Sequence, residues 1–212
     1  MENKRVLITG GNSGIGKIAA IELAKKGASL VLACRPGDKT EVALAEINAV
    51  ATQEAINLPV DLACLESVRN LAREFLARYD ALDVLINNAG VFPSRKKLTE
   101  DGFEMQIGVN HLSHFLLTEL LIDVLKSTAS SRVVTVSSML HKKGEMDFAS
   151  FRGEKKYSSQ KAYAQSKLAN VLFSMELAKR LADNDVTSNC LHPGGVRTDI
   201  MRDLPWLVRK LV

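Results

Sequence analysis

The residues best suited to acid–base chemistry in this sequence are Tyr163 and Lys167, four positions apart in a segment with a helical pattern. Side chains at this spacing lie on one face of a helix, so both can reach one ligand. An ordinary tyrosine has a pKa near 10 and transfers protons poorly at neutral pH. A neighbouring ammonium favours the phenolate and lowers that pKa. The pair could therefore exchange a proton with a carbonyl or alcohol oxygen.

A second pair, Tyr157 and Lys161, has the same spacing and could do the same chemistry. It lies nearer the polar segment 153–156, at the approach to the expected helix. The helix after Lys167 instead continues into an apolar run. We therefore favour Tyr163 as the reacting phenol, with Tyr157 as the alternative.

A glycine-rich turn joins the first predicted strand to the first predicted helix, over residues 9–16. Glycines at such a turn let the backbone bend tightly and approach a pyrophosphate, whose charge the helix N-terminus stabilises. The turn follows a strand and opens a helix in the first βαβ unit, so it predicts a dinucleotide site. The predicted contacts are Gly10, Asn12, Ser13, Gly14, Ile15 and Gly16.

The end of the second predicted strand indicates which dinucleotide binds. NAD-binding folds place an acidic residue about 20 residues after the glycine turn, where it binds the ribose hydroxyls. Here the strand ends in Cys34 and Arg35, and an arginine can pair with the 2′-phosphate of NADP. Two alternatives stay open: Arg35 as a solvated loop residue, and Asp38 as the ribose acceptor within a turn. We predict NADP.

Short β-branched runs alternate with longer segments of helical period along the chain. Strands are predicted at 6–9, 29–33, 55–60, 84–87, 132–137 and 186–191, and helices at about 15–24, 40–50, 66–79, 103–126 and 158–183. Runs that are apolar on both faces belong to a parallel sheet covered by helices on both sides. We predict one α/β domain over residues 1–212, with a Rossmann-like, doubly wound parallel sheet of about six strands.

The composition, 46% hydrophobic and 25% charged, is that of a soluble globular protein. The net charge of +4 is scattered without a basic stripe, so we expect no nucleic-acid partner. Three unevenly spaced cysteines indicate a reducing compartment, and with no secretory or membrane-spanning segment we expect a cytoplasmic location. His111 and His114 have no third ligand nearby, so we expect no metal site.

Three motifs resemble those of the short-chain dehydrogenase/reductase family: Gly10-x3-Gly14-x-Gly16, Asn87-Asn88-Ala89-Gly90 and Tyr163-Ala164-Gln165-Ser166-Lys167. The matches run in order from residue 5 to about residue 198. Segments 30–35, 110–118 and 166–170 look like the retinol dehydrogenase branch. The resemblance implies NADP-linked hydride transfer between a carbonyl and an alcohol, the substrate being a retinoid or another lipophilic aldehyde or alcohol.

The resemblance also implies roles for individual residues. The family form Tyr-x-x-Ser-Lys favours Tyr163 as the proton-transferring phenol. The positive charge of the oxidised nicotinamide would act with Lys167 to lower the pKa of this phenol, and Lys167 would also hold the nicotinamide ribose. Ser138, rather than Ser137, would orient the substrate oxygen, and Asn110 would hold a water that relays protons from Lys167. Further cofactor contacts would be Asp61, Leu62, Asn88, Ala89, Gly90, Pro193, Gly194, Val196 and Thr198. For Asp61, an N-cap or solvated loop position is the alternative.

Family members usually continue beyond the last residues of this sequence to another helix and a seventh strand. We therefore expect either a truncated form or a short member whose sheet has an exposed edge. Residues 199–212 would be a partial substrate loop, and a membrane-surface helix over 201–212 is the alternative. A homo-oligomer also stays open. If the missing region is essential, the chain would be a catalytically weak or inactive cofactor-binding scaffold or sensor.

Overall fold

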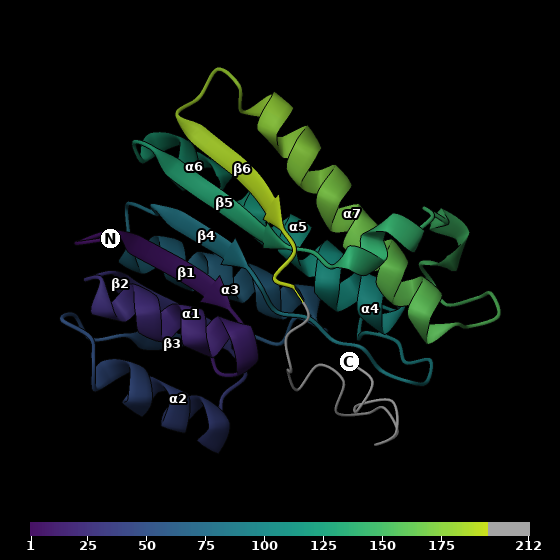
Figure 1. Ribbon diagram of the computed structural model, residues 1–212, viewed down its shortest axis with the longest axis horizontal. Helices are drawn as coiled ribbons and strands as arrows, with labels where there is room; N and C mark the ends of the chain where they lie inside the picture. Colours follow the sequence, from purple (N-terminus) through teal and green to yellow (C-terminus); the bar gives the residue numbers. More distant parts are fainter. Residues whose placement is uncertain (195–212) are drawn as a thin grey trace.

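A six-stranded parallel sheet forms the centre of the computed structural model, which describes residues 1–194 (Figure 1). The strands lie in the order β3-β2-β1-β4-β5-β6. Their bounds are β1 Arg5–Thr9, β2 Ser29–Cys34, β3 Ile56–Pro59, β4 Val84–Asn87, β5 Ser131–Val136 and β6 Val186–Leu191. The order reverses between β1 and β4, as in doubly wound folds. The predicted fold class is confirmed, and the predicted strands agree within two residues at each end.

Helices cover both faces of this sheet. One layer contains α1 (Gly14–Lys25) and α2 (Asp38–Asn48), and the other contains α3 (Leu65–Arg78), α5 (Ser113–Leu120), α6 (Ile122–Ser127) and α7 (Ser159–Arg180). Figure 1 shows α1 and α2 together on one side of the sheet. The interleaved order of strands and helices thus gives two cores, one on each face.

Alternate residues of the central strands serve the two cores. Val6 and Ile8 of β1 are fully buried against α1 and α2, whereas Leu7 between them is buried in the other core. In the register of the sheet, Ile8 pairs with Leu32 of β2 and with Ile86 of β4. This two-sided burial explains why these strands are continuous apolar runs rather than alternating ones.

The helix predicted over about 103–126 is observed as helical structure from Met105 to Ser127, but it is not one regular α-helix. The chain instead forms a short α4 (Met105–Ile107), a π-helical turn at Gly108–Leu112, and then α5 and α6. The Ser113 hydroxyl donates hydrogen bonds to the carbonyls of Gly108 and Leu62, which stabilises the wider turn. The spacing of apolar residues along the sequence does not reveal tertiary contacts of this kind. Single π turns inside helices often occur at functional sites.

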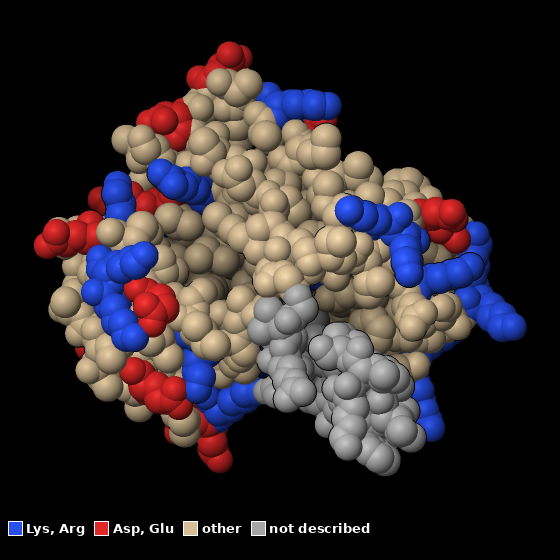
Figure 2. All heavy atoms as spheres, viewed as in Figure 1, with Lys and Arg blue, Asp and Glu red and all other residues tan. Residues whose placement is uncertain are grey.

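The surface carries charges of both signs. On the face shown in Figure 2, Lys and Arg are interspersed with Asp and Glu around the rim, and neutral residues occupy the centre. None of the helices in residues 1–194 combines the length and apolar character needed to cross a bilayer. The predicted tail helix over 201–212 lies outside the described residues.

The core predicts a strong effect of truncating Phe75, which is fully buried on α3 and stacks on Tyr79 at 5.0 Å between ring centroids. Phe75→Ala should lower the free energy of unfolding by about 3–5 kcal/mol, measured by urea denaturation, because it leaves a cavity. Leu76→Ala, at a 46% exposed position of the same helix, is the matched control. Equal losses in both variants would contradict the assignment of the core.

Candidate active site

The predicted site residues gather beyond the carboxyl ends of the parallel strands. The glycine turn follows β1, Arg35 follows β2, Asp61 follows β3, and Asn88 follows β4. Ser138 follows β5, and the segment beginning at His192 follows β6. In open α/β sheets the ligand crevice lies at this edge, where the strand order reverses. The sheet therefore brings segments far apart in sequence to one edge.

The glycine turn is braced by Asn88. Its amide nitrogen donates to the carbonyls of Thr9, at 2.8 Å, and of Gly10, at 3.4 Å. Gly10 and Gly14 have φ values of +66° and +52°, which favour glycine. A Cβ on Gly16 would lie 2.4 Å from both the Asn88 amide nitrogen and the Gly10 carbonyl oxygen. Glycine is thus required here for close packing of the helix on the turn.

A buried network links this turn to the π-helical segment. The Thr9 hydroxyl accepts hydrogen bonds from the backbone N–H groups of Asn88 and Ala89 and contacts His114 Nε2 at 2.8 Å. His114 Nδ1 lies 3.1 Å from the Asn110 carbonyl, which can only accept, so Nδ1 carries the proton. Burial lowers the pKa of His114 to about 4, which keeps the ring neutral. His114 is therefore a buried bridge, not a metal ligand.

A hollow of about 330 Å³ lies beside the glycine turn. Its lining residues are Asn12, Ser13, Gly14, Lys17, Asp38, Lys39, Val42 and Ala43. The lysines were missed by the sequence analysis. Lys17 lies one turn along α1 from Gly14, so its side chain lines the same hollow as the glycine turn. This three-residue spacing was visible in the sequence and could have identified Lys17. The Lys17 ammonium also pairs with Glu46 at 2.7 Å.

Arg35 lies exposed at the tip of β2, and its carbonyl accepts from the Thr40 hydroxyl at 2.6 Å. Thr40 in turn accepts from the Asn12 amide at 2.8 Å, which ties this tip to the glycine turn. Asp38, the alternative ribose acceptor, begins α2 and lines the same hollow. Arg35 and Asp38, the two alternative partners of the adenosine ribose, therefore both lie next to the glycine turn.

Asp61 and Leu62 follow β3 as predicted. The Asp61 side chain hydrogen-bonds within the loop, and the Leu62 side chain packs in the core. The Asp61 carboxylate accepts from the Ala63 N–H at 2.9 Å, closing a turn. The Leu62 side chain is buried, and its carbonyl accepts from Ser113 at 2.5 Å. This geometry agrees with the loop alternative for Asp61 and leaves the backbone of Leu62 as its means of touching a ligand.

The structure brings Tyr163, Ser138 and Lys167 together. Burial raises the pKa of Tyr163 to about 12, and a hydrogen bond with the Ser138 side chain opposes this rise. The Lys167 ammonium lies 5.6 Å from the centroid of the Tyr163 ring. Ser137, the neighbour of Ser138, instead donates its hydroxyl to the Lys167 carbonyl at 2.8 Å. Tyr157 of the alternative pair interacts elsewhere, with Gln106 and Pro93.

The ammonium of Lys167 is fully buried and donates to the Val136 carbonyl at 2.9 Å. Burial lowers its pKa to about 8. Desolvation is the largest influence on the phenol and raises the pKa of Tyr163, so the predicted lowering of this pKa by Lys167 together with an oxidised nicotinamide stays a prediction. A further positive charge is needed to stabilise the phenolate.

Asn110 lies in the π-helical turn, and its side chain clasps the loop after β4. Its carbonyl oxygen accepts from the Val91 N–H at 2.7 Å, and its amide donates to the Val91 carbonyl at 3.1 Å and to the Ser166 hydroxyl at 3.0 Å. Ser166 donates onward to the Tyr163 carbonyl at 2.8 Å. Asn110 thus holds the backbone next to Tyr163, and its role in a water relay stays a prediction.

The loop after β6 places Pro193 and Gly194 at the same edge of the sheet, and Gly194 has a φ of +86°. The other two predicted contacts of this loop, Val196 and Thr198, lie outside the described residues. The site as described therefore includes the start of this segment.

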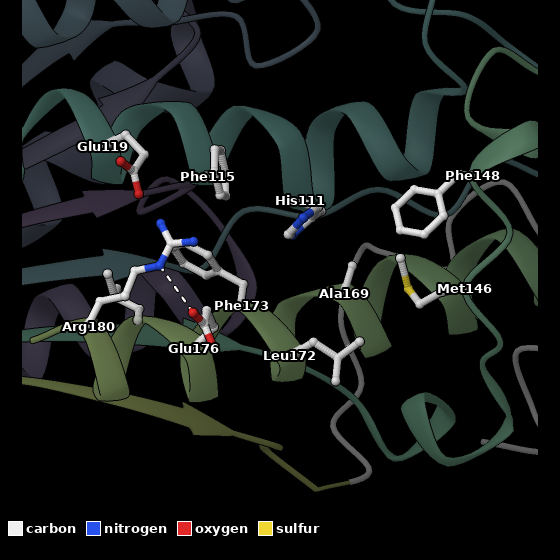
Figure 3. A pocket seen from close by; sticks show the side chains of 11 residues that line it. His111, Phe115, Glu119, Met146, Phe148, Ala169, Leu172, Phe173, Glu176 and Arg180 are labelled. Atoms are coloured by element: carbon white, nitrogen blue, oxygen red, sulfur yellow. Dashed lines mark hydrogen bonds and ion pairs between the residues drawn. The ribbon is translucent and has the colours of Figure 1, made fainter.

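A separate apolar groove of about 270 Å³ lies between α5 and α7 (Figure 3). The aromatic rings of Phe115 and Phe173 lie 5.5 Å apart within it. Figure 3 shows Arg180 paired with Glu176 at one end, at 3.2 Å. None of the predicted site residues lines this groove.

Comparison with known proteins agrees with this fold. The sequence profile of the family described as short chain dehydrogenase matches residues 4–206. Retinol dehydrogenase 14 of Mus musculus is 47% identical, covering 100% of this chain and 67% of that protein. Retinol dehydrogenase 11 of Mus musculus is 49% identical over 95% of this chain and 64% of its own length. The chain thus spans about two thirds of the length of these relatives.

A solved short chain dehydrogenase from Burkholderia cenocepacia J2315, in complex with NADP, is 29% identical, with a TM-score of 0.76 over 94% of this chain and 77% of that one. The chain belongs to the short-chain dehydrogenase family of oxidoreductases. Within that family it groups with the retinol dehydrogenases.

The burial of Lys167 predicts that this side chain destabilises the fold at neutral pH. Lys167→Met should raise the free energy of unfolding at pH 7 by roughly 1–3 kcal/mol, measured by urea denaturation, because a desolvated charge is removed. The unfolded chain binds the lysine proton more strongly between pH 8 and 10.5, so the wild type gains stability as pH rises through this window.

The gain from Lys167→Met should therefore shrink to about 1 kcal/mol or less at pH 10. Lys179→Met, at an exposed position of α7, is the control and should change stability little at either pH. A Lys167→Met variant less stable than the wild type at pH 7 would show that the ammonium stabilises the fold.

Proposed function

We propose that this chain is an NADP(H)-dependent oxidoreductase that transfers hydride between the nicotinamide and a carbonyl/alcohol pair. The observation that carries the proposal is the convergence of Tyr163, Ser138 and Lys167 beyond β5, next to a turn that only glycine can form. The family membership supports the reaction class. The comparisons give no support to the alternative of a scaffold without turnover.

The residues at the glycine turn fit a dinucleotide. A side chain at Gly16 would clash with the Gly10 carbonyl, Gly10 and Gly14 have positive φ values, and the 12-residue α1 begins directly at this turn. A pyrophosphate would be held there by the helix N-terminus and backbone N–H groups. Asn88 and Thr9 keep this backbone in place.

The choice of NADP rests on Arg35. Its exposed guanidinium at the tip of β2 suits a 2′-phosphate, and Lys17 and Lys39 line the hollow beside it. The NADP complex of the related Burkholderia enzyme supports the same cofactor. Asp38 is the residue that would favour NAD instead.

In the proposed mechanism Tyr163 donates its proton to a carbonyl oxygen in reduction, or accepts it from an alcohol in oxidation. Ser138 donates a hydrogen bond to the same oxygen and orients it. Lys167 holds the nicotinamide ribose, and its ammonium stabilises the phenolate. When bound, the nicotinamide supplies or accepts the hydride and, in its oxidised form, adds positive charge at the site. That charge would offset the burial that raises the pKa of Tyr163.

The substrate class is a lipophilic aldehyde or alcohol, with retinoids as the first candidates. The support is the grouping with proteins named retinol dehydrogenases. Next to Ser138, Met139 is 50% exposed and offers an apolar surface at the site. Oxidation of NADPH, followed at 340 nm with retinal and with shorter aldehydes, tests this assignment.

Replacement of the phenol should remove most of the turnover. Tyr163→Phe should lower kcat by about 10²–10⁴-fold, because the proton donor is lost while the ring remains. The NADPH dissociation constant should stay within a few-fold, and Tyr79→Phe, at the residue after α3, is the control. If Tyr157→Phe abolishes turnover and Tyr163→Phe does not, the alternative pair performs the chemistry. NADPH binding without turnover in the wild type would favour the scaffold.

Reversal of charge at Arg35 should change the cofactor preference. Arg35→Asp should reduce kcat/KM for NADPH and raise it for NADH, moving their ratio by about tenfold or more, because a carboxylate repels the 2′-phosphate and accepts from ribose hydroxyls. Lys179→Asp carries the same change of charge at an exposed site on α7. An unaltered ratio in Arg35→Asp would remove the basis for choosing NADP.

A further inference from the structure

The loop after β4 is anchored by hydrogen bonds at two residues, Val91 and Pro93. Asn110 clasps both backbone groups of Val91. The Pro93 carbonyl accepts two hydrogen bonds, from the Ser159 hydroxyl at 2.6 Å and from the Tyr157 hydroxyl at 3.2 Å. Phe92 lies between these two anchors.

The ring of Phe92 is thereby held against Tyr163. The two ring centroids are 4.7 Å apart, and the planes meet edge to face at 75°. This geometry is a favourable aromatic pair. Tyr163 is 8% exposed, whereas Phe92 is half-buried, so solvent or a ligand can reach part of Phe92.

The position of Phe92 has a consequence for any substrate of the proposed reaction. A carbonyl oxygen that takes a proton from Tyr163 must lie within hydrogen-bond reach of the phenol. The carbon atoms beside that carbonyl then lie next to the neighbours of the phenol ring. Phe92 is the aromatic neighbour of Tyr163 among the described residues.

We propose that Phe92 is a specificity-determining residue that contacts the substrate beside the reacting carbon, and that Tyr157 and Ser159 are positioning residues that fix it through the Pro93 carbonyl. This inference rests on the proposed function and deepens it. It also explains the second Tyr–Lys spacing: Tyr157 serves the site from behind the loop, with its hydroxyl accepting from Gln106 at 2.9 Å. In this role the Phe92 ring excludes substrates that are branched at the carbon next to the carbonyl.

The test compares two aldehydes, hexanal and 2,2-dimethylpropanal, in NADPH oxidation by the full chain. Phe92→Ala should raise the kcat/KM ratio of the branched to the linear aldehyde by about tenfold, because the removed ring opens space at the branch. The KM for NADPH should not change. Phe115→Ala, on the outer flank of α5, is the matched control and should leave the ratio unaltered.

The positioning role of Tyr157 and Ser159 is tested with the double variant Tyr157→Phe, Ser159→Ala. It removes both donors to the Pro93 carbonyl but keeps the aromatic ring at position 157 and the helix α7. This double variant should shift the ratio in the same direction, by a smaller factor, through the KM of the aldehyde rather than through kcat. A role confined to stability would lower kcat/KM for both aldehydes equally and raise the KM for NADPH. That outcome would overturn the positioning role.

A second measurement distinguishes failure of the proposed function from failure of the role proposed for Phe92. Calorimetric titration of hexanol and of 2,2-dimethylpropanol into the protein with NADPH measures the affinity ratio without turnover. If the wild type turns over neither of these aldehydes nor retinal, the proposed function fails, and a shifted affinity ratio in Phe92→Ala still supports Phe92 as a ligand contact. An unshifted ratio in both the kinetic and the calorimetric assay would refute the proposal.

Discussion

The ammonium of Lys167 is fully buried, with a backbone carbonyl, that of Val136, as its hydrogen-bond acceptor. A desolvated charge held in this way destabilises a fold, and burial lowers the pKa of this lysine to about 8. The cost is tolerated because α7 packs on the sheet through apolar residues that include Phe173 and Leu177. The position of this charge beside Tyr163 then defines the reacting end of the site.

The two ends of the site are connected through buried polar groups rather than through the apolar cores. Thr9 hydrogen-bonds the turn after β4 and His114, and His114 hydrogen-bonds the carbonyl of Asn110. The Asn110 side chain clasps Val91 and contacts Ser166. A network of this kind loses free energy when any member is left unpaired, so it fixes one arrangement of the glycine turn relative to Tyr163. This network therefore fixes the position of the predicted cofactor site relative to the Tyr163 phenol.

The sequence was sufficient for the features that depend on local pattern. Two-sided apolar runs such as Val6-Leu7-Ile8 predicted the parallel sheet, and the glycine turn was identified because it joins a strand to a helix. The Tyr163–Lys167 spacing predicted two side chains on one helical face, and the structure places the Lys167 ammonium 5.6 Å from the centroid of the Tyr163 ring.

Features that depend on tertiary contacts could not be predicted in this way. The π-helical turn at Gly108–Leu112 follows from the bonds that Ser113 makes. The raised pKa of Tyr163 follows from burial, which a sequence does not show. The anchored loop at Phe92 requires donors from residues more than 60 positions away. Each of these features lies at the site, where local pattern and final structure most often diverge.

The central claim is that Tyr163 faces the bound nicotinamide, and the pH titration of its phenol tests this most directly. The measurement is the phenolate absorbance at 295 nm between pH 7 and 10, for the wild type minus Tyr163→Phe, with and without NADP⁺. One phenol should titrate in this range with NADP⁺ and none without it, because the nicotinamide charge offsets the burial that raises the pKa to about 12. Identical difference curves in both conditions would contradict the account.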